Sequence, residues 1–189
     1  MQYNPDIHHR RSIRLKGYDY TGEGWYFITT CTRNYRHLFG KIENGAMMAN
    51  DDGRMVEQQW LGLVDRYANV TLHEFIVMPN HFHGIVALVG VPLVGAQNGR
   101  QPQNRAPTRG APTVGNVVGA FKSLTTNDYI QNVKHHDWQR FGKQLWQRNF
   151  YEHIIRDQDS YLKIVEYIQT NPLKWTEDRY YGGSAALPI

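Results

Sequence analysis

The sequence predicts an α+β fold, in which helices pack against an antiparallel sheet. Short runs of β-branched and aromatic residues are mixed with segments whose apolar residues recur at helical spacing. Most successive strands are separated by only a short turn, and short turns join antiparallel neighbours. The length of 189 residues suits one domain with an added arm or lid, and no internal repeat is visible.

Strands are expected where β-branched and aromatic residues cluster between turn signals. The expected strands cover residues 24–32, the two short arms of a hairpin within 39–49, and residues 72–78, 82–89 and 145–155. Asn44-Gly45 is the expected hairpin turn, because both residues tolerate the left-handed backbone of a two-residue loop. Pro79-Asn80 is the expected tight turn between the strands at residues 72–78 and 82–89.

Helices are expected where apolar residues recur every three to four positions. The expected helices cover residues 51–69, 114–130 and 158–171. Either Asp51 or Asp52 is the expected N-cap of the first helix. Asp157 is the expected cap of the last helix, and Pro172 ends it because the residue before a proline avoids helical backbone. Residues 90–113 are rich in Gly, Pro, Asn and Gln, carry arginines but no acidic residue, and indicate a mobile basic linker.

Composition narrows the class of protein. The chain has 21 Lys and Arg against 17 Asp and Glu, a formal charge of +4, which permits a nucleic-acid partner without requiring one. The single cysteine, Cys31, excludes a disulfide framework and a cysteine-based zinc site within one chain. The N-terminus is polar, and no apolar run approaches the length of a transmembrane helix. We therefore expect a cytoplasmic protein with no membrane contact.

The segment VMPNHFHGIV (residues 77–86) places two histidines at the start of an expected strand. Strand side chains alternate between faces, so His81 and His83 share one face, about 7 Å apart, and Phe82 takes the other. Burying two imidazoles costs free energy unless each finds a partner, and a divalent cation is a partner that both can share. The alternative is a structural role, in which other buried groups satisfy both rings.

The last expected helix offers two polar side chains on one flank of its apolar stripe. Tyr167 and Asn171 are four residues apart, so they lie on the same face of the helix. Each has a simpler interpretation: Tyr167 can rest its ring on the edge of the core, and Asn171 can end the helix ahead of Pro172.

Together these segments resemble the single-tyrosine HUH transposases, in particular the REP-associated tyrosine transposases. The resemblance spans about residues 18–175 and rests on MPNHFHGIV, VEYIQTNP, YFITTCTRNYRHLFG, GAFKS and LWQRNFYEHIIRDQDSYLKIVEYIQTNPLKW. It implies three parts: a basic arm (1–17), an HUH domain (18–175) with the mobile insertion 90–113, and a C-terminal tail (176–189).

The resemblance implies a ferredoxin-like, RRM-like antiparallel sheet, the HUH nuclease fold. It also implies that His81 and His83 bind Mg²⁺ or Mn²⁺, that Asn171 completes the metal shell, and that Tyr167 is the nucleophile. Many relatives have glutamine at the position of Asn171. The implied reaction cleaves and rejoins single-stranded DNA, as a hairpin or palindromic repeat, through a 5′-phosphotyrosine, in a monomer or a homodimer.

Single-stranded DNA needs cations for its phosphates and aromatic surfaces for its bases. The candidate DNA-binding residues are Arg10, Arg11, Arg14, Arg33, Arg36, Lys122, Trp146, Arg148 and Arg156. Tyr151 is the second candidate nucleophile. Two other functions stay open: a domesticated single-stranded DNA or RNA hairpin-binding module without cleavage, and a metal-dependent phosphohydrolase that activates water at the histidine pair.

Overall fold

The structure, a computed structural model, describes residues 23–89 and 112–181. The predicted arm (1–17), nearly all of the predicted linker (90–113) and the end of the predicted tail lie outside these ranges. Within the described ranges, no helix combines the length and apolar character needed to cross a bilayer.

The main sheet has four strands, all antiparallel to their neighbours. They are β1 (Gly24–Cys31), β4 (Val70–Met78), β5 (His81–Leu88) and β6 (Tyr151–Ile155), in the spatial order β4-β5-β1-β6. A separate hairpin pairs β2 (Gly40–Glu43) with β3 (Ala46–Ala49). Apart from that hairpin, the elements follow the β-α-β-β-α-β order of ferredoxin-like folds before the last helix. The predicted α+β class and ferredoxin-like sheet are confirmed.

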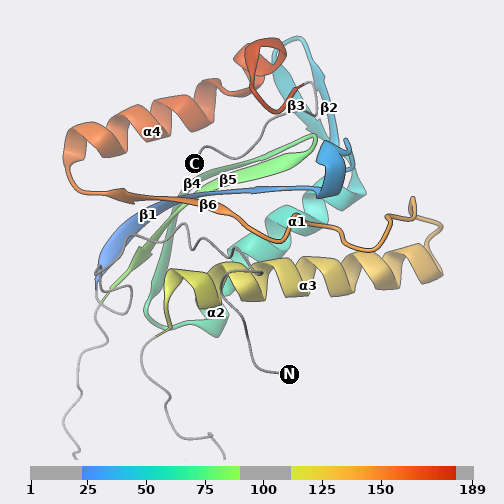
Figure 1. Cartoon of the computed structure of the whole chain (residues 1–189), viewed down its shortest axis with the longest axis horizontal. Helices are drawn as coiled ribbons and strands as arrows, with labels where there is room; N and C mark the ends of the chain where they lie inside the picture. The colour runs from blue at the N-terminus through green and yellow to red at the C-terminus, as the bar shows by residue number, and fades with distance from the viewer. Residues whose placement is uncertain (1–22, 90–111, 182–189) are drawn as a thin grey trace, which may run out of the picture.

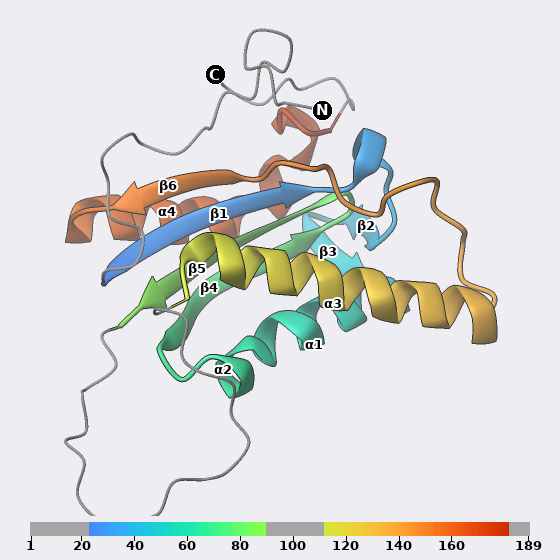
Figure 2. The same cartoon turned by 60° about the horizontal axis from the view of Figure 1, so that its bottom comes forward.

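Helices cover both faces of this sheet (Figure 1). The helices are α1 (Asp51–Leu61), α2 (Leu63–Arg66), α3 (Val114–His135) and α4 (Gln158–Thr170), with short 3₁₀ turns η1 (Arg33–Tyr35) and η2 (Pro172–Glu177). Figure 2 shows α1, α2 and α3 together on one face and α4 alone on the other. The sheet is therefore the middle of three layers.

The alternation of side chains along β5 divides the core between these layers. Phe82 points toward α1 and α3, where its ring lies 4.7 Å from Trp60 and 4.9 Å from Phe121 between centroids. Ile85 points toward α4 and belongs to a smaller cluster that includes Ile168. Every residue of β5 is buried, as expected for a central strand covered on both faces.

The turn at Asn44-Gly45 is confirmed: both residues have positive φ, 51° and 73°, as a two-residue hairpin loop requires. The N-cap of α1 was predicted wrongly. Asn50 caps this helix, since its side chain accepts a hydrogen bond from the backbone N–H of Gly53 at 2.9 Å. Asp51 and Asp52 instead occupy the first turn, where their charges favour the positive end of the helix dipole.

The predicted strand over residues 145–155 is wrong in its first half, because β6 begins only at Tyr151. Trp146 forms a single isolated bridge to Thr32. The backbone carbonyls of residues 147, 148 and 149 accept hydrogen bonds from the ammonium of Lys122. A lysine on α3 thus satisfies carbonyls that a strand would have paired with its neighbour.

Gly84, in the middle of β5, should be intolerant of a side chain. An added Cβ would lie 2.8 Å from atoms of both the Phe82 and Trp60 rings, which are buried and cannot move freely. We expect Gly84→Ala to lower the free energy of unfolding by about 1–3 kcal/mol through overpacking. Urea unfolding measures this change.

Gly119→Ala is the matched control, because nothing lies within 4 Å of a Cβ at this exposed position of α3. Alanine is the better helix former, so this variant should gain about 0.5–1 kcal/mol. An unchanged or increased stability of Gly84→Ala would contradict the packing described for β5.

Candidate active site

His81 and His83 lie on the sheet face that α4 covers. Their exposed fractions are 0% and 1%, and their ring centroids are 4.5 Å apart. The predicted common face of the two rings is confirmed.

The neighbouring side chain of Asn80 fixes the protonation of His81. Asn80 Nδ2 donates to the backbone carbonyls of Tyr35 (3.2 Å) and Tyr180 (2.9 Å), so its Oδ1 is the atom turned toward the histidine. Oδ1 can only accept, and it lies 2.8 Å from Nδ1 of His81. Nδ1 therefore carries the proton, and the lone pair of the ring is at Nε2.

His83 is held from both sides of its ring. Its Nδ1 lies 2.7 Å from Oγ1 of Thr29 on β1, and its Nε2 lies 3.3 Å from the hydroxyl of Tyr167 on α4. Burial, reinforced by the charge of Arg179, lowers the pKa of His83 to about 3. Burial also holds the pKa of His81 well below its ordinary value. Both rings are therefore neutral at physiological pH, which is the form that binds a metal ion.

Helix α4 brings Tyr167 to this pair. The helix starts at Asp157, whose side chain accepts a hydrogen bond from the Ser160 N–H at 2.7 Å, as the sequence predicts. The ring of Tyr167 stands edge-on to Phe27 (6.1 Å) and His83 (5.2 Å), and 40% of the residue is exposed. Tyr167 thus has a fixed ring and a face that a substrate can reach.

Asn171 forms the C-terminal end of α4 and is buried. Its Nδ2 donates to Oδ2 of Asp178 at 3.1 Å, which fixes the orientation of the amide. Its Oδ1 is buried and accepts no hydrogen bond from the described residues. The same is true of Nε2 of His81. Two buried acceptor atoms without donors are costly, unless a cation or another donor binds them.

The turn that follows η2 adds three residues that the sequence analysis did not identify: Asp178, Arg179 and Tyr180. The side chain of Asp178 accepts from the Tyr180 N–H at 2.7 Å, which closes the turn. The ring of Tyr180 lies 4.6 Å from that of His81. The guanidinium of Arg179 lies over this tyrosine, 4.6 Å from its centroid, and 5.8 Å from the centroid of Tyr151. Packing therefore continues beyond residue 175.

The donor set fits a divalent cation. One ligand atom from each of His81, His83 and Asp178 lies within 4.8 Å of the other two. Two neutral imidazoles and one carboxylate suit Mn²⁺ and similar ions, while Mg²⁺ favours a larger share of oxygen ligands. The free Oδ1 of Asn171 is a further oxygen at the same end of α4.

The hydroxyl of Tyr167 is not an activated nucleophile in this arrangement. Burial raises its pKa to about 12, and the nearby charge of Asp178 adds to the rise. Arg179 and the side chain of Asn171 act in the opposite direction and lower this pKa. A cation or an additional hydrogen-bond donor is needed before a useful fraction of phenolate forms at neutral pH.

Three other residues were predicted from the sequence as a second nucleophile or as DNA-binding residues, and the structure places them as follows. Tyr151 begins β6 beside it, with its ring 6.4 Å from Phe27. Trp146 is 4% exposed, and its Nε1 donates to Thr125, so the prediction that it stacks on a DNA base is wrong. Lys122 is committed to the three backbone carbonyls described above, which does not fit its expected contact with phosphate.

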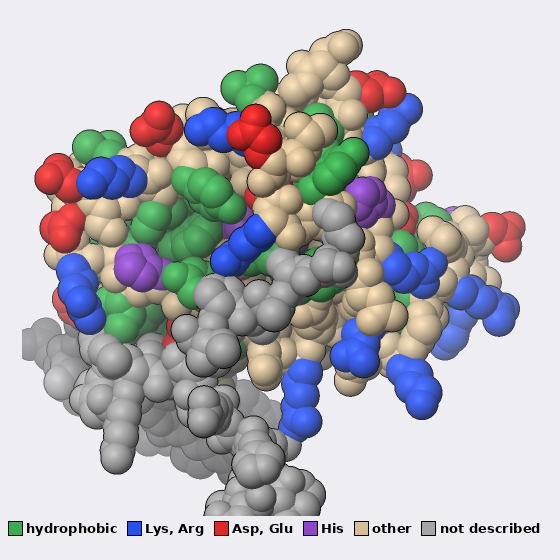
Figure 3. Space-filling view, turned by 45° about the horizontal axis from the view of Figure 1, so that its top comes forward, with side chains coloured by type: hydrophobic (Ala, Val, Ile, Leu, Met, Phe, Trp, Pro, Cys, Tyr) green, Lys and Arg blue, Asp and Glu red, His purple; other side chains and the backbone are tan. Residues whose placement is uncertain are grey.

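The remaining predicted DNA-binding residues fall into two groups. Arg33, Arg36, Arg148 and Arg156 are on the surface or half-buried. Arg10, Arg11 and Arg14 lie outside the described residues. Figure 3 shows several Lys and Arg side chains gathered at the lower right of the molecule, on the side where α3 ends.

No protein-family model matches the chain. The chain is 45% identical over 184 residues to an uncharacterized protein of Haemophilus influenzae, and the match covers 95% of this chain and 97% of that protein. Among solved structures, it is similar to a REP-associated tyrosine transposase bound to a REP hairpin, with a TM-score of 0.53 and 18% identity. That match covers 87% of this chain and 74% of the transposase chain.

The buried neutral histidines should make the fold sensitive to acid. An unfolded histidine binds a proton below about pH 6.5, whereas His83 in the folded chain does so only near its pKa of about 3. Between these values the unfolded state binds more protons, so stability falls as the pH falls, by up to about 1.4 kcal/mol per pH unit for one histidine.

His83→Gln isolates this contribution, because glutamine keeps hydrogen-bonding groups but does not titrate. We expect a shallower loss of stability for the variant than for the wild type in urea unfolding between about pH 7 and about pH 5. Identical slopes for the two proteins would mean that His83 is not kept neutral by the fold.

Proposed function

We propose that this chain, which belongs to one family with the Haemophilus influenzae protein and has the fold of a REP-associated tyrosine transposase, cleaves and rejoins single-stranded DNA. The observation that carries the proposal is the meeting of Tyr167 with the buried histidine pair on that fold, 3.3 Å from Nε2 of His83. A tyrosine beside a metal-competent histidine pair suits covalent phosphoryl transfer.

The reaction that we propose is a transesterification. The Tyr167 oxygen attacks the phosphorus of a phosphodiester and forms a Tyr–O–P bond to the 5′ side of the DNA. The bond between phosphorus and the 3′ oxygen breaks. The phenol loses a proton and the departing 3′ oxygen gains one, so the atoms balance and no nucleotide triphosphate is needed. Attack by the 3′ hydroxyl of another strand reverses the step and joins DNA.

Each residue near the hydroxyl has a distinct role in this proposal. His83, with a pKa of about 3, is too weak a base to remove the phenolic proton, so it orients the hydroxyl. Arg179 is exposed and lowers the pKa of Tyr167. Its guanidinium is the cation of this chain that we assign to the phosphate oxygens, because arginine binds phosphate through two parallel hydrogen bonds.

His81, His83 and Asp178 would hold the divalent ion, Mn²⁺ or Mg²⁺, with the Oδ1 of Asn171 as a further oxygen ligand. A bound ion would polarise the scissile phosphate and neutralise negative charge on its oxygens. An ion at Nε2 of His83 would replace its contact with the Tyr167 hydroxyl, so the orienting role of His83 applies before an ion is held.

The substrate that we propose is a hairpin or palindromic repeat with a single-stranded flank. The similar transposase is bound to a REP hairpin, and this chain has basic surface residues suited to phosphates. Tyr167 lies against the histidines of its own chain, which supports cleavage in cis whether the protein is a monomer or a homodimer. We expect this reaction to take place in the bacterial cytoplasm, at the nucleoid.

Tyr167→Phe should abolish the covalent DNA adduct, because it removes the attacking oxygen and keeps the ring contacts. Incubation with labelled single-stranded hairpin DNA and Mn²⁺, followed by a denaturing gel, measures the adduct. DNA binding should change little. Tyr151→Phe is the matched control, since the ring of Tyr151 also lies edge-on to Phe27, at 6.4 Å against 6.1 Å for Tyr167, and near Arg179. An adduct that survives in Tyr167→Phe and disappears in Tyr151→Phe would reassign the nucleophile.

Mn²⁺ should stabilise the folded wild type against heat or urea, by about 2.7 kcal/mol at a concentration 100 times the dissociation constant. Asp178→Asn should weaken Mn²⁺ binding by at least about tenfold, because it removes the charged ligand. Asp65→Asn, on the exposed surface of α2, is the control and should behave as the wild type. Absence of stabilisation in the wild type would contradict the metal site, and equal stabilisation in both variants would remove Asp178 from it.

A further inference from the structure

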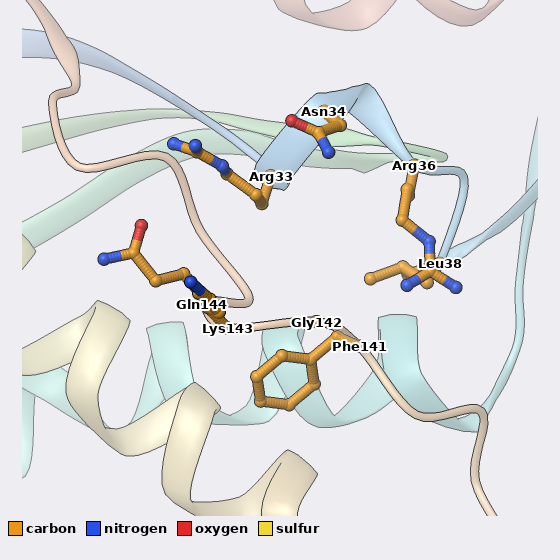
Figure 4. Close-up of a pocket in the computed structure, with 8 residues that line it drawn as sticks. All are labelled: Arg33, Asn34, Arg36, Leu38, Phe141, Gly142, Lys143 and Gln144. Carbon is orange, nitrogen blue, oxygen red and sulfur yellow. The ribbon is translucent and has the colours of Figure 1, made fainter.

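A pocket of about 490 Å³ lies between η1 and the loop that follows α3 (Figure 4). We call it the loop pocket. Its lining includes Arg33, Asn34, Arg36, Phe141, Lys143 and Gln144. Figure 4 shows the first three of these residues on one loop and the last three on the other, with the cavity between them. The size lies within the range of pockets that hold a small ligand or one nucleotide.

All charged side chains that line the loop pocket are positive. Three cations line it, and none of its lining residues is acidic. The side chains of Arg33 and Lys143 are exposed and form no ion pair within residues 23–89 and 112–181. By contrast, Lys41 is paired with Glu43 and Arg54 with Asp51 elsewhere on the surface. Unpaired cations that line a cavity suit the phosphate groups of a nucleic acid.

The loop pocket also has features that suit a nucleobase. The ring of Phe141 is half-buried and is held edge-on to Tyr129 at 5.2 Å, so its position is fixed. A fixed aromatic ring is a stacking surface for a base. The side-chain amides of Asn34 and Gln144 can each donate and accept hydrogen bonds at the edge of that base.

The backbone of η1, on one side of the loop pocket, is strained, and a hydrogen bond joins it to the opposite loop. Asn34 and Tyr35 both have left-handed backbone, with φ of 57° and 52°, which is rare for a tyrosine. The side chain of Arg36 donates to the carbonyl of Arg140 at 3.2 Å and so connects the two loops. Strained backbone that surrounding contacts hold in place is common at binding sites.

Hydrogen bonds join this side of the loop pocket to the candidate active site. The backbone N–H of Thr32 donates to the carbonyl of Asn80 at 2.9 Å, and its hydroxyl donates to the carbonyl of Arg36 at 2.8 Å. The Leu38 N–H donates to the carbonyl of Pro79 at 2.9 Å. Pro79 and Asn80 form the turn that begins the histidine strand. The loop pocket is therefore fixed relative to His81, at the same end of the sheet.

We propose that the loop pocket binds one nucleotide of the single-stranded DNA that flanks the cleaved phosphodiester. Arg33 and Lys143 bind the two phosphates that flank this nucleotide, Arg36 adds positive charge between the two loops, and Phe141 stacks on its base. The inference rests on the proposed function, because it extends the DNA path from Tyr167 around the end of the sheet. In this inference the residues of the loop pocket hold the DNA strand in position and take no part in the bond-breaking step.

The test compares two double variants of the full chain, each in the Tyr167→Phe background so that binding is measured without cleavage. Arg33→Gln/Lys143→Gln removes two unpaired cations of the loop pocket. Lys41→Gln/Arg54→Gln removes the same charge from paired sites. Fluorescence anisotropy of a labelled single-stranded hairpin oligonucleotide is measured over a range of salt concentrations.

Each phosphate contact to single-stranded DNA adds about 0.7 to the slope of log affinity against log salt. We expect the loop-pocket variant to lose about 1.4 from this slope and to bind on the order of 20-fold more weakly near 0.1 M salt. Phe141→Leu, which keeps apolar packing but removes the aromatic ring, should weaken binding by about fivefold or more at every salt concentration. The paired-site control should lose much less in both measurements.

Equal affinities and slopes for the two double variants would overturn the inference. Competition gives a second criterion. If free deoxynucleoside monophosphate or inorganic phosphate displaced the oligonucleotide at concentrations similar to that of the oligonucleotide, the pocket would serve a small molecule and the inference would be overturned. These outcomes are separate from failure of the proposed function. If the two double variants bind DNA equally while the protein with Tyr167 intact forms the covalent adduct, the loop-pocket inference is refuted and the proposed function stands.

Discussion

The orientation of one side-chain amide, that of Asn80, is the constraint on which the candidate site depends. Its two donors bind the carbonyls of Tyr35 and Tyr180, and its acceptor binds His81. These partners come from the loop after β1, from the turn after η2 and from β5 itself. Asn80 is fully buried, so a rotated amide would leave several polar groups unsatisfied at once. The arrangement therefore holds three segments together and fixes the protonation of a metal-competent ring.

Burial and two opposing charges set the ionisation of Tyr167. Burial keeps both histidines neutral and raises the pKa of the tyrosine to about 12. Asp178 opposes ionisation of Tyr167 and Arg179 favours it. In our proposal, a cation beside Asp178 removes that opposition, and Arg179 binds the phosphate of the substrate. Burial and the charge of Asp178 would thus keep the tyrosine protonated until a cation is held at the site.

Local patterns in the sequence predicted the parts of this structure that depend on neighbours along the chain. The face shared by His81 and His83 follows from strand alternation, and the hairpin follows from Asn44-Gly45. Helix α4 follows from its apolar stripe and its cap at Asp157. The ferredoxin-like order of the strands came from the family resemblance, because periodicity alone does not state which strands are neighbours.

The contributions that sequence reasoning missed depend on contacts between distant segments. Asp178 reaches the histidines only because the chain turns back after η2, and no local pattern marks that turn as part of the site. Trp146 looked like a surface aromatic, but Phe39 and Phe121 pack against its ring. Lys122 looked like a phosphate ligand, but it lies beneath backbone carbonyls that needed a donor. Contacts between distant segments decided each of these cases, and such contacts are a property of the folded chain.

Identification of the residue that becomes bonded to DNA tests the central claim most directly. Trypsin cuts after Lys163 and Lys174, and the peptide between these sites contains Tyr167 as its only tyrosine. Tyr151 lies on a separate peptide, between Arg148 and Arg156. After reaction with a single-stranded hairpin and Mn²⁺, followed by trypsin and nuclease digestion, mass spectrometry should find a phosphate-linked nucleotide on the peptide of Tyr167. A nucleotide on the peptide of Tyr151, or cleaved DNA with no modified peptide, would contradict the account.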